Sequence, residues 1–414
     1  KYSIPGNELF LSQQHVLNVR QIIIFVGKEK DMLTLLKSCE IYAPDYLGIG
    51  DILLGGTKIL AIKKEIHPPA GMETELINCS GYMVFPGLID PVCFFCGNGA
   101  DEEEQRQNNA SDFAEAAFVS GVSSVIGTLG WNDITRSAGE LLQKTKQLNF
   151  SGLNTGAYTG GFRGNSCIFL QRIASDLAYI QEITATGPMA IADHRAGMPE
   201  ESLFANLHAE AETGAELGRK SAVVVYMLGE DKSQYSKTLE KMQNIVPVHR
   251  HAMLSGVNRN NEAMKAAKKF GIKGLINIVA NTTGFFQEET IHPATALKEF
   301  LRAGVPIKNI TLSSYAGFEA VKPNPIDIKN QMRLFFKAFG ESISDFNIPT
   351  EIVAKVFSRN AAETFKMQGK GILKPGMHAD VLVLTKDYHP AHLFINGEHR
   401  LIDGVMVPRA NHPS

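Results

Sequence analysis

The sequence predicts an α/β protein in which a (β/α)8 TIM barrel is inserted into a small β-sandwich domain. Through the middle of the chain, short apolar runs alternate with helical stretches about every 30 residues, the spacing of βαβ units. Short β-type runs without helices lie near both ends. We therefore expect an extension over 1–31, sandwich segments over 32–82 and 369–414, and the barrel over 83–368.

The first sandwich segment begins after an extension that fits no part of the core pattern. Within that extension, Val16–Val26 is rich in β-forming residues and suits an added strand or a contact with another subunit. Gly55-Gly56-Thr57 has the composition of a hairpin turn. The β-type runs expected at the two ends of the chain are Leu33–Leu36, Gly50–Leu54, Lys58–Ile62, Glu75–Cys79, Gly369–Leu384, His392–Ile395 and Arg400–Val405.

Eight apolar runs are expected to form the barrel strands. Helices are expected over Ser111–Ser120, with Asp112 near its start, and over Asn261–Phe270. Gly160–Arg172 and Ala196–Gly214 lack a clear pattern, and we expect long loops there. The expected strands are Val84–Asp90, Ser123–Leu129, Leu153–Thr159, Pro188–Asp193, Ala222–Leu228, His251–Val257, Leu275–Ala280 and Ile310–Tyr315.

Composition excludes several classes of partner. The formal net charge is -2, which gives no electrostatic basis for binding nucleic acid or an anionic membrane. No apolar run approaches the roughly 20 residues that span a bilayer. The opening KYSIPGNELF has no signal-peptide pattern, and five cysteines do not form a disulfide framework. We expect a cytoplasmic protein with reduced thiols.

The run Met83–Gly99, MVFPGLIDPVCFFCGNG, resembles the first barrel strand of the amidohydrolase superfamily, P-G-[FL]-I-D-x-H-x-H. Gly369–Leu384 resembles a second motif of that superfamily, G-x-[IL]-x-P-G-x-x-A-D-[LV], which marks the return to the small domain. The two histidines of the first motif are metal ligands. Their places here hold Val92 and Phe94, neither of which offers a lone pair to zinc.

Further motifs narrow the resemblance to the isoaspartyl (β-aspartyl) dipeptidases, over about residues 32–405. That family binds two zinc ions with four histidines, a carbamylated lysine and an aspartate. The metals activate a bridging water, and the aspartate moves the proton. The matching segments are Leu35–Leu54, Gly121–Gly130, Thr155–Tyr158, Ala192–Arg195, Val257–Asn260 and Thr311–Ser314.

The resemblance implies that all six metal-ligand positions are degenerate. The first two are Val92 and Phe94. The lysine falls near Ser175, and no lysine occurs between Lys146 and Lys220. The remaining histidines and the aspartate fall on Met227, Gly256 and Tyr315. The expectation is therefore no metal cofactor and no catalytic residue of the family type.

Some substrate-binding positions are retained by the same resemblance. Arg195 and Arg259 match arginines that hold a substrate carboxylate, Tyr158 matches a tyrosine at the scissile carbonyl, and Asp101 takes the place of a glutamate that binds the substrate amine. Two other contact positions are replaced, at Trp131 and Phe318-Glu319. The arginines suit a small carboxylate ligand; alternatively, bulky residues at Phe94, Trp131, Met227 and Tyr315 fill the cavity.

Three other groups of residues have structural interpretations. Cys93 and Cys96 form a CxxC but lack a thioredoxin-like context or further zinc ligands, so we expect buried thiols. His249 and His251 have ligand spacing but lie at the start of a strand, away from the catalytic end. His194 is expected to be hydrogen-bonded, and the acidic run Asp101–Glu104 to be solvated.

The function we expect is that of a pseudoenzyme, an inactive isoaspartyl dipeptidase homologue with a structural, self-assembling or ligand-binding role. The family forms homo-oligomers, so the resemblance implies self-assembly. One alternative is a remodelled, metal-independent hydrolase of small dipeptides or amides that uses Tyr158, His194 and the arginines. Another is a scaffold like the dihydropyrimidinase-related proteins, which share the fold and have lost the metal site.

Overall fold

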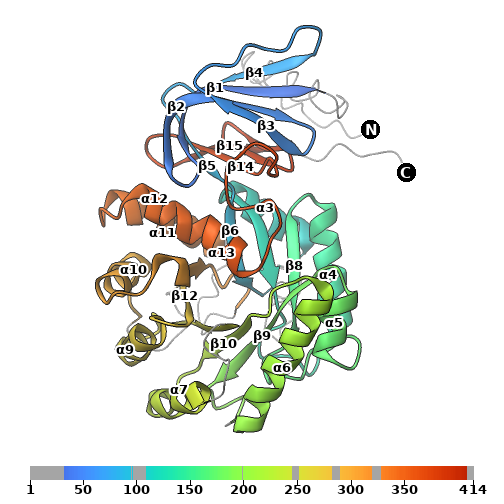
Figure 1. Ribbon diagram of the computed structural model, residues 1–414, viewed down its shortest axis with the longest axis vertical. Coiled ribbons are helices and arrows are strands. Elements are labelled where there is room, and N and C mark those ends of the chain that lie inside the picture. Colours follow the sequence, from blue (N-terminus) through green and yellow to red (C-terminus); the bar gives the residue numbers. More distant parts are fainter. Residues whose placement is uncertain are drawn as a thin grey trace, which may run out of the picture.

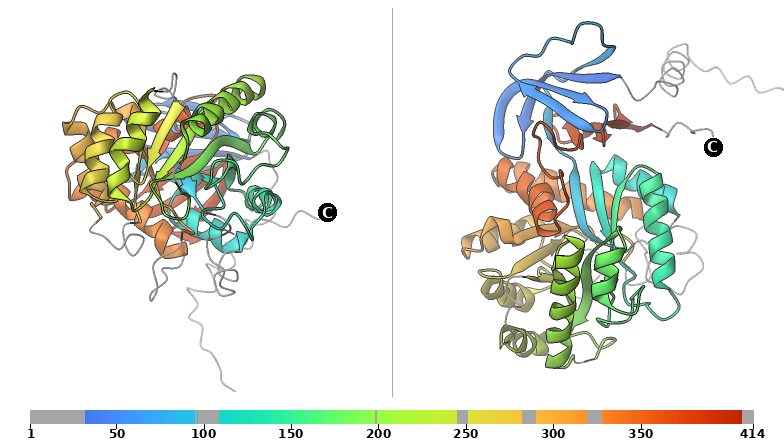
Figure 2. Two further views of the ribbon diagram at one scale, coloured as in Figure 1. Left: turned by 90° about the horizontal axis from the view of Figure 1, so that it is seen from below. Right: turned by 45° about the vertical axis from the view of Figure 1, so that its right-hand side comes forward.

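The computed structural model describes residues 32–94, 96, 109–197, 199–244, 251–281, 290–318 and 328–407. An eight-stranded parallel sheet forms a nearly closed barrel, and a nine-stranded sheet draws on both ends of the chain. Figure 1 shows this small sheet above the barrel, and Figure 2 shows helices around the outside of the barrel strands. Val16–Val26, where an added strand or a subunit contact was expected, lies outside the described residues. None of the helices in the described ranges is long and apolar enough to cross a membrane.

Every barrel strand overlaps a strand predicted from the sequence. The signal is strong because strands covered by helices on one face and by the barrel interior on the other read as near-continuous apolar runs. The strands are β6 (Leu88–Cys93), β7 (Val122–Gly127), β8 (Asn154–Gly160), β9 (Ile183–Ile191), β10 (Val224–Leu228), β11 (Ala252–Ser255), β12 (Leu275–Val279) and β13 (Ile310–Ser313).

The first predicted strand is divided between the two sheets. Met83–Pro86 is β5, which pairs with strands of the small sheet, and the barrel begins at β6. Gly87 lies between them, and its N–H donates to the Asp380 carbonyl at 2.9 Å. A Cβ on Gly87 would lie 2.5 Å from the Cβ of Ser123, so only glycine fits where the chain passes from one sheet to the other.

Helices cover the outside of the barrel. The two predicted helices are present as α3, whose N-cap is Asn109, and α9, whose N-cap is Asn260. The described helices are α3 (Ala110–Val119), α4 (Ala138–Phe150), α5 (Ile173–Tyr179), α6 (Glu201–Gly218), α7 (Tyr235–Asn244), α9 (Asn261–Phe270), α10 (Pro293–Arg302), α11 (Ile328–Ser344), α12 (Thr350–Ala354) and α13 (Asn360–Thr364), with a π-helical turn, η3, at Lys355–Arg359 and short 3-10 turns η1 (Lys232–Gln234) and η2 (Ile307–Asn309).

The prediction of a loop over Ala196–Gly214 was wrong for most of its length, because α6 occupies it. The buried face of α6 includes His208, Ala211 and Gly214, which give a weak apolar pattern. Gly214 is needed for close packing, since a Cβ there would lie 2.7 Å from Cα of Ala174. By contrast, Gly160–Arg172 has no helix or strand beyond Gly160, where an isolated bridge joins Gly160 to Cys167.

The small domain is one curled sheet rather than two separate sheets. Its order is β17-β16-β15-β14-β5-β1-β2-β3, with β4 beside β1. The bridge between Lys58 and His378 brings β3 against the segment that leads into β14, and a shared apolar core lies inside the curl. The strands are β1 (Leu33–Tyr42), β2 (Tyr46–Gly55), β3 (Lys58–Lys63), β4 (Thr74–Asn78), β14 (Val381–Leu384), β15 (Pro390–Ile395), β16 (Glu398–Ile402) and β17 (Val405–Met406).

Asp380 joins the small sheet to the base of the barrel. Its carboxylate accepts hydrogen bonds from Lys370 Nζ at 2.8 Å, from Asn154 Nδ2 at 3.2 Å and from the Asn396 backbone N–H at 2.7 Å. Asn154 begins β8 of the barrel, whereas Asn396 follows β15 of the small sheet. Asp380 is buried and its three partners are partly buried, and this network fixes the two parts of the chain relative to each other.

Candidate functional site

The carboxyl ends of the barrel strands form the mouth where catalytic residues of TIM-barrel enzymes lie. In this chain the first and last strands are joined there by backbone hydrogen bonds. The Tyr315 N–H donates to the Val92 carbonyl at 3.2 Å, and the Phe94 N–H donates to the Ala316 carbonyl at 2.7 Å. Three of the positions equated with metal ligands therefore lie on the seam that closes the barrel.

Four of those positions belong to one buried apolar cluster, Val92, Phe94, Met227 and Tyr315. The ring of Phe94 lies 5.4 Å from that of Tyr315 and 4.6 Å from that of Phe318, measured between centroids. Such edge-to-face contacts are favourable for aromatic side chains. The expectation that bulky residues fill the interior is consistent with this packing.

The fifth position, Gly256, lies beside the hydroxyl of Tyr315. A Cβ on Gly256 would be 3.8 Å from that oxygen. The hydroxyl itself lies 2.5 Å from Ser255 Oγ, which accepts a hydrogen bond from Asn277 Nδ2 at 2.8 Å. Asn277 Nδ2 also donates to Ser313 Oγ, at 2.6 Å. The space beside strands β11 to β13 is thus occupied by a buried polar network.

Ser175 does not join the other five positions. It lies on α5, which follows β8, and it is not part of the interior cluster. The fourth barrel strand is β9, which contributes Ala185 and Ala190 to that cluster. The alignment of the family's metal-binding lysine with Ser175 was therefore wrong. Ser175 lies on a helix of the outer wall, and such a helix cannot present a ligand to the barrel interior. The sequence of β9, ITATGPMAI, also has no lysine.

The side chains at these positions do not fit a zinc centre. Val92, Phe94 and Gly256 have no donor atom, and Met227 offers only a thioether. Burial raises the pKa of the Tyr315 phenol above its ordinary value, so this oxygen keeps its proton. Zinc sites in proteins use thiolate, imidazole and carboxylate ligands, which this set lacks.

At the mouth, Arg195 is paired with an aspartate of its own segment. Its Nε and one terminal nitrogen donate to the two oxygens of Asp193 at 3.0 and 2.9 Å. Burial alone would raise the pKa of Asp193, but the hydrogen bonds from Arg195 outweigh it and hold that pKa below the ordinary value. The guanidinium also lies 5.7 Å from the ring centroids of Trp131 and Phe162.

Arg259 is brought to the same mouth from the segment after β11. It donates to the Leu228 carbonyl at 3.0 Å, and its second terminal nitrogen lies 3.6 Å from Glu230 Oε2. His194 Nδ1 contacts the other oxygen of Glu230 and lies 4.0 Å from Asp193. Asp193, His194 and Glu230 thus form a chain of charged and polar groups between the two arginines.

Sequence reasoning missed Glu230 as a partner of Arg259. The one available signal was its position, directly after Gly229 at the end of a barrel strand. Asp193, His194 and Glu230 each offer one atom that could bind a metal ion, and these three atoms lie within 4.8 Å of one another. Both oxygens of Asp193 already accept hydrogen bonds from Arg195, which argues for an ion-pair network there.

Tyr158, expected at the scissile carbonyl of a substrate, is buried in the barrel interior. Its hydroxyl donates to the Pro91 carbonyl at 2.7 Å, and the side chain is fully buried against Phe365. Trp131 is half-buried beside Arg195, and Phe318 belongs to the interior cluster. Asp101, Glu319 and His249 lie outside the described residues.

The structure describes three residues of the remaining motifs, Cys93, Cys96 and His251. Cys93 and Cys96 are free buried thiols, and burial raises the pKa of Cys96 to about 12. His251 precedes β11, at the end of the barrel opposite the mouth, where its Nδ1 lies 3.3 Å from Glu212. Cys93 ends β6 on the mouth side of the barrel, whereas His251 lies at the opposite end.

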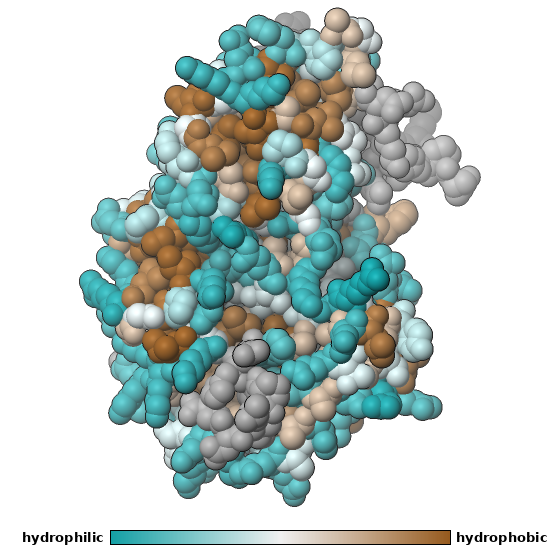
Figure 3. Space-filling view, viewed as in Figure 1, coloured by the Kyte–Doolittle hydropathy of each residue, from teal (hydrophilic) through white to brown (hydrophobic). Residues whose placement is uncertain are grey.

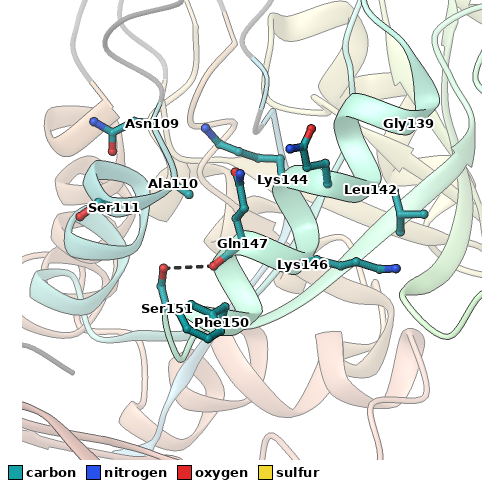
Figure 4. Close-up of a pocket in the computed structure, with 11 residues that line it drawn as sticks. Asn109, Ala110, Ser111, Gly139, Leu142, Lys144, Lys146, Gln147, Phe150 and Ser151 are labelled. Carbon is teal, nitrogen blue, oxygen red and sulfur yellow. Dashed lines mark hydrogen bonds between the residues drawn. The ribbon is translucent and has the colours of Figure 1, made fainter. Parts of the chain in front are cut away.

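The described residues also line hollows away from the interior cluster. A groove of about 1050 Å³ lies on the outside of the barrel between α3 and α4, and includes Lys144, Lys146 and Phe150 (Figure 4). A smaller pocket of about 330 Å³ lies beside the mouth, between the end of β9 and the start of α6, with Arg163 in its wall. Arg163 is paired with Asp133, so its charge is balanced within the chain.

Comparison with solved structures shows an amidohydrolase-type fold. The β-aspartyl dipeptidase of Fervidobacterium islandicum AW-1 in complex with β-Asp-Leu has 24% identity and a TM-score of 0.80 over 92% of this chain and 98% of that chain. A D-hydantoinase has 14% identity and a TM-score of 0.65 over 92% and 97%. The N-acetylglucosamine-6-phosphate deacetylase of Pasteurella multocida has 14% identity and a TM-score of 0.60 over 89% and 100%. No protein-family model matches the chain.

Proposed function

We propose that this chain is a pseudoenzyme: it does not carry out metal-dependent amide hydrolysis and instead binds a small carboxylate at the barrel mouth. The observation that carries the proposal is the packing of Val92, Phe94, Met227 and Tyr315 into one buried cluster. Hydrolysis of an amide by a dipeptidase-type site requires a metal-activated water and a base. The mouth residues that the structure describes offer two paired arginines in place of that machinery.

Carboxylate binding follows from the arrangement of Arg195 and Arg259. Asp193 is almost fully buried and holds Arg195 in place, whereas Glu230 is about one-third exposed. A ligand carboxylate would therefore replace Glu230, not Asp193, as the partner of Arg259 and His194. Arg259 meets Glu230 through one terminal nitrogen at 3.6 Å, while its other terminal nitrogen donates to the Leu228 carbonyl, so a ligand carboxylate would take over that single charge contact.

Calorimetric titration with β-Asp-Leu as the probe tests this site. Glu230→Gln removes the competing charge, and we expect it to tighten binding roughly tenfold, whereas Arg259→Met weakens it by a similar factor. Glu212→Gln is the matched control, because Glu212 pairs with His251 away from the mouth. Absence of binding to the wild type, or equal affinity in all three variants, would contradict the proposal.

Self-assembly is the second part of the proposed role, and the family resemblance supports it. Native mass spectrometry of the full chain would measure it. We expect a species larger than 45.3 kDa, the mass of one chain. A strict monomer across micromolar concentrations would remove the structural role and leave ligand binding alone.

A remodelled hydrolase is the alternative, favoured by one observation. His194 is exposed at the mouth and contacts Glu230, which resembles a base and the group that orients it. Its test is turnover of β-Asp-Leu that survives chelators and is lost in His194→Gln. The hydroxyl of Tyr158 donates a hydrogen bond to the Pro91 carbonyl, which argues against a direct role of Tyr158 in such chemistry.

A further inference from the structure

One face of the small sheet is apolar and incompletely covered by the described residues. Leu35 of β1 lies beside Leu53 of β2 and beside Leu76 of β4, so all three share a face. Leu60 of β3 is on the same face, because a Cβ on Gly55 would lie within 2.8 Å of both Leu33 and Leu60. Leu60 and Leu76 remain 47% and 60% exposed.

The apolar face continues along β2 beyond a polar interruption. Lys37 and Asp51 form an ion pair of 2.5 Å on this face. Past that pair, Leu47 and Ile49 are 56% and 68% exposed. Figure 3 shows apolar side chains gathered over the small sheet at the top of the molecule. Exposed apolar side chains gathered on one face of a sheet in this way mark a contact site.

We propose that Val16–Val26 of the same chain covers this face. Six residues separate Val26 from Leu33, a span of up to about 20 Å, and Leu33 itself belongs to the face. The segment is therefore tethered next to the surface it would cover. Its local concentration exceeds that of a second copy, which favours a contact within the chain.

The pattern of the segment also matches the face. In an extended strand, alternate residues point to one side, and here one set is Leu17, Val19, Gln21, Ile23 and Phe25. Two apolar residues precede and two follow the single polar one. The face has the same order, with exposed Leu47 and Ile49 on one side of the Lys37–Asp51 pair and exposed Leu60 and Leu76 on the other.

Hydrogen exchange of the full chain tests this contact. We expect the amides of 17–25 to exchange at least about tenfold more slowly than in an unstructured peptide of the same sequence. The double variant Leu60→Glu and Leu76→Glu should abolish that protection. Leu217→Glu on α6, also an exposed leucine, is the matched control and should leave it unchanged.

Two results would overturn the proposal. One is exchange of 17–25 at the unstructured rate in the wild type, or protection that the double variant does not alter. The other is protection that disappears on dilution together with a dimer measured by native mass, which would assign the face to a second copy.

Discussion

The hydroxyl of Tyr315 lies 2.5 Å from Ser255 Oγ, across the space between the ends of β13 and β11. Tyr315 is the position where the resemblance implies a catalytic aspartate. Its backbone is left-handed, with φ of 54°, and its ring packs against Phe94 at the barrel seam. This one side chain therefore fills space, satisfies a buried hydroxyl and helps to close the barrel.

Removing the Tyr315 hydroxyl should cost stability without opening the barrel. Tyr315→Phe leaves Ser255 with its bond from Asn277, so we expect a loss of about 1 kcal/mol in the free energy of unfolding. Tyr315→Ala should cost about 3–5 kcal/mol, since it leaves a cavity among aromatic rings. Urea unfolding measures both. Tyr179→Phe, at an exposed tyrosine, is the control, and equal effects at the two sites would contradict the packing role.

Asp90 should make stability depend on pH in the direction opposite to most carboxylates. Burial raises its pKa from 3.8 to about 7, against hydrogen bonds from Ser314 and Val92. The folded protein thus binds a proton that the unfolded chain releases. This contribution, at most about 4 kcal/mol, is complete below pH 3.8 and is lost as pH rises through 7.

The difference between wild type and Asp90→Asn isolates that contribution. Measured by urea unfolding from pH 4 to 8, the stability of the wild type relative to the variant should fall as the pH rises. A constant difference across this range would show that Asp90 is ionised throughout.

His208 should make the folded protein less stable as the pH falls. Burial, and then the nearby His251, lower its pKa from 6.5 to about 4, and neither ring nitrogen has a hydrogen-bond partner among the described residues. The folded protein therefore keeps this ring neutral. Its contribution is complete above pH 6.5 and is lost as the pH falls towards 4, by up to about 3 kcal/mol. His208→Phe should flatten the acid side of the stability curve, and an unchanged slope in that variant would be the contrary result.

Asp380 should be the most sensitive polar residue of the domain junction. Asp380→Ala leaves Lys370, itself largely buried, without its carboxylate and frees two further donors. Breaking a buried ion pair in this way costs about 3–5 kcal/mol. Thermal unfolding should show the loss, with exposed Asp387→Ala as the control. A similar melting temperature for both variants would rule out the junction role.

The parts of the fold that the sequence predicts best are those with one dominant signal. Most barrel strands read as apolar runs because they are buried on both faces, and the predicted strands overlap all eight. Helix α6 was missed because His208, Ala211 and Gly214 occupy its buried face. Ser175 was misplaced because no motif fixes the alignment between Tyr158 and Ala192.

The candidate site was less predictable than the fold, because it depends on pairings between strands. Arg195 and Arg259 were identified from local motifs. Their partners were not fixed by sequence, since Glu230 and Arg259 are 29 positions apart and meet only when β10 and β11 are adjacent. The direction of the Tyr158 hydroxyl, towards the Pro91 carbonyl, is likewise a product of packing.

The central claim is that this chain has lost metal-dependent hydrolysis, and the most direct measurement is turnover of β-Asp-Leu by the purified full chain with added zinc. We predict no leucine release above the no-enzyme control, together with no stoichiometric zinc after desalting. Zinc-dependent release that a chelator abolishes, at one or two zinc ions per chain, would contradict the account.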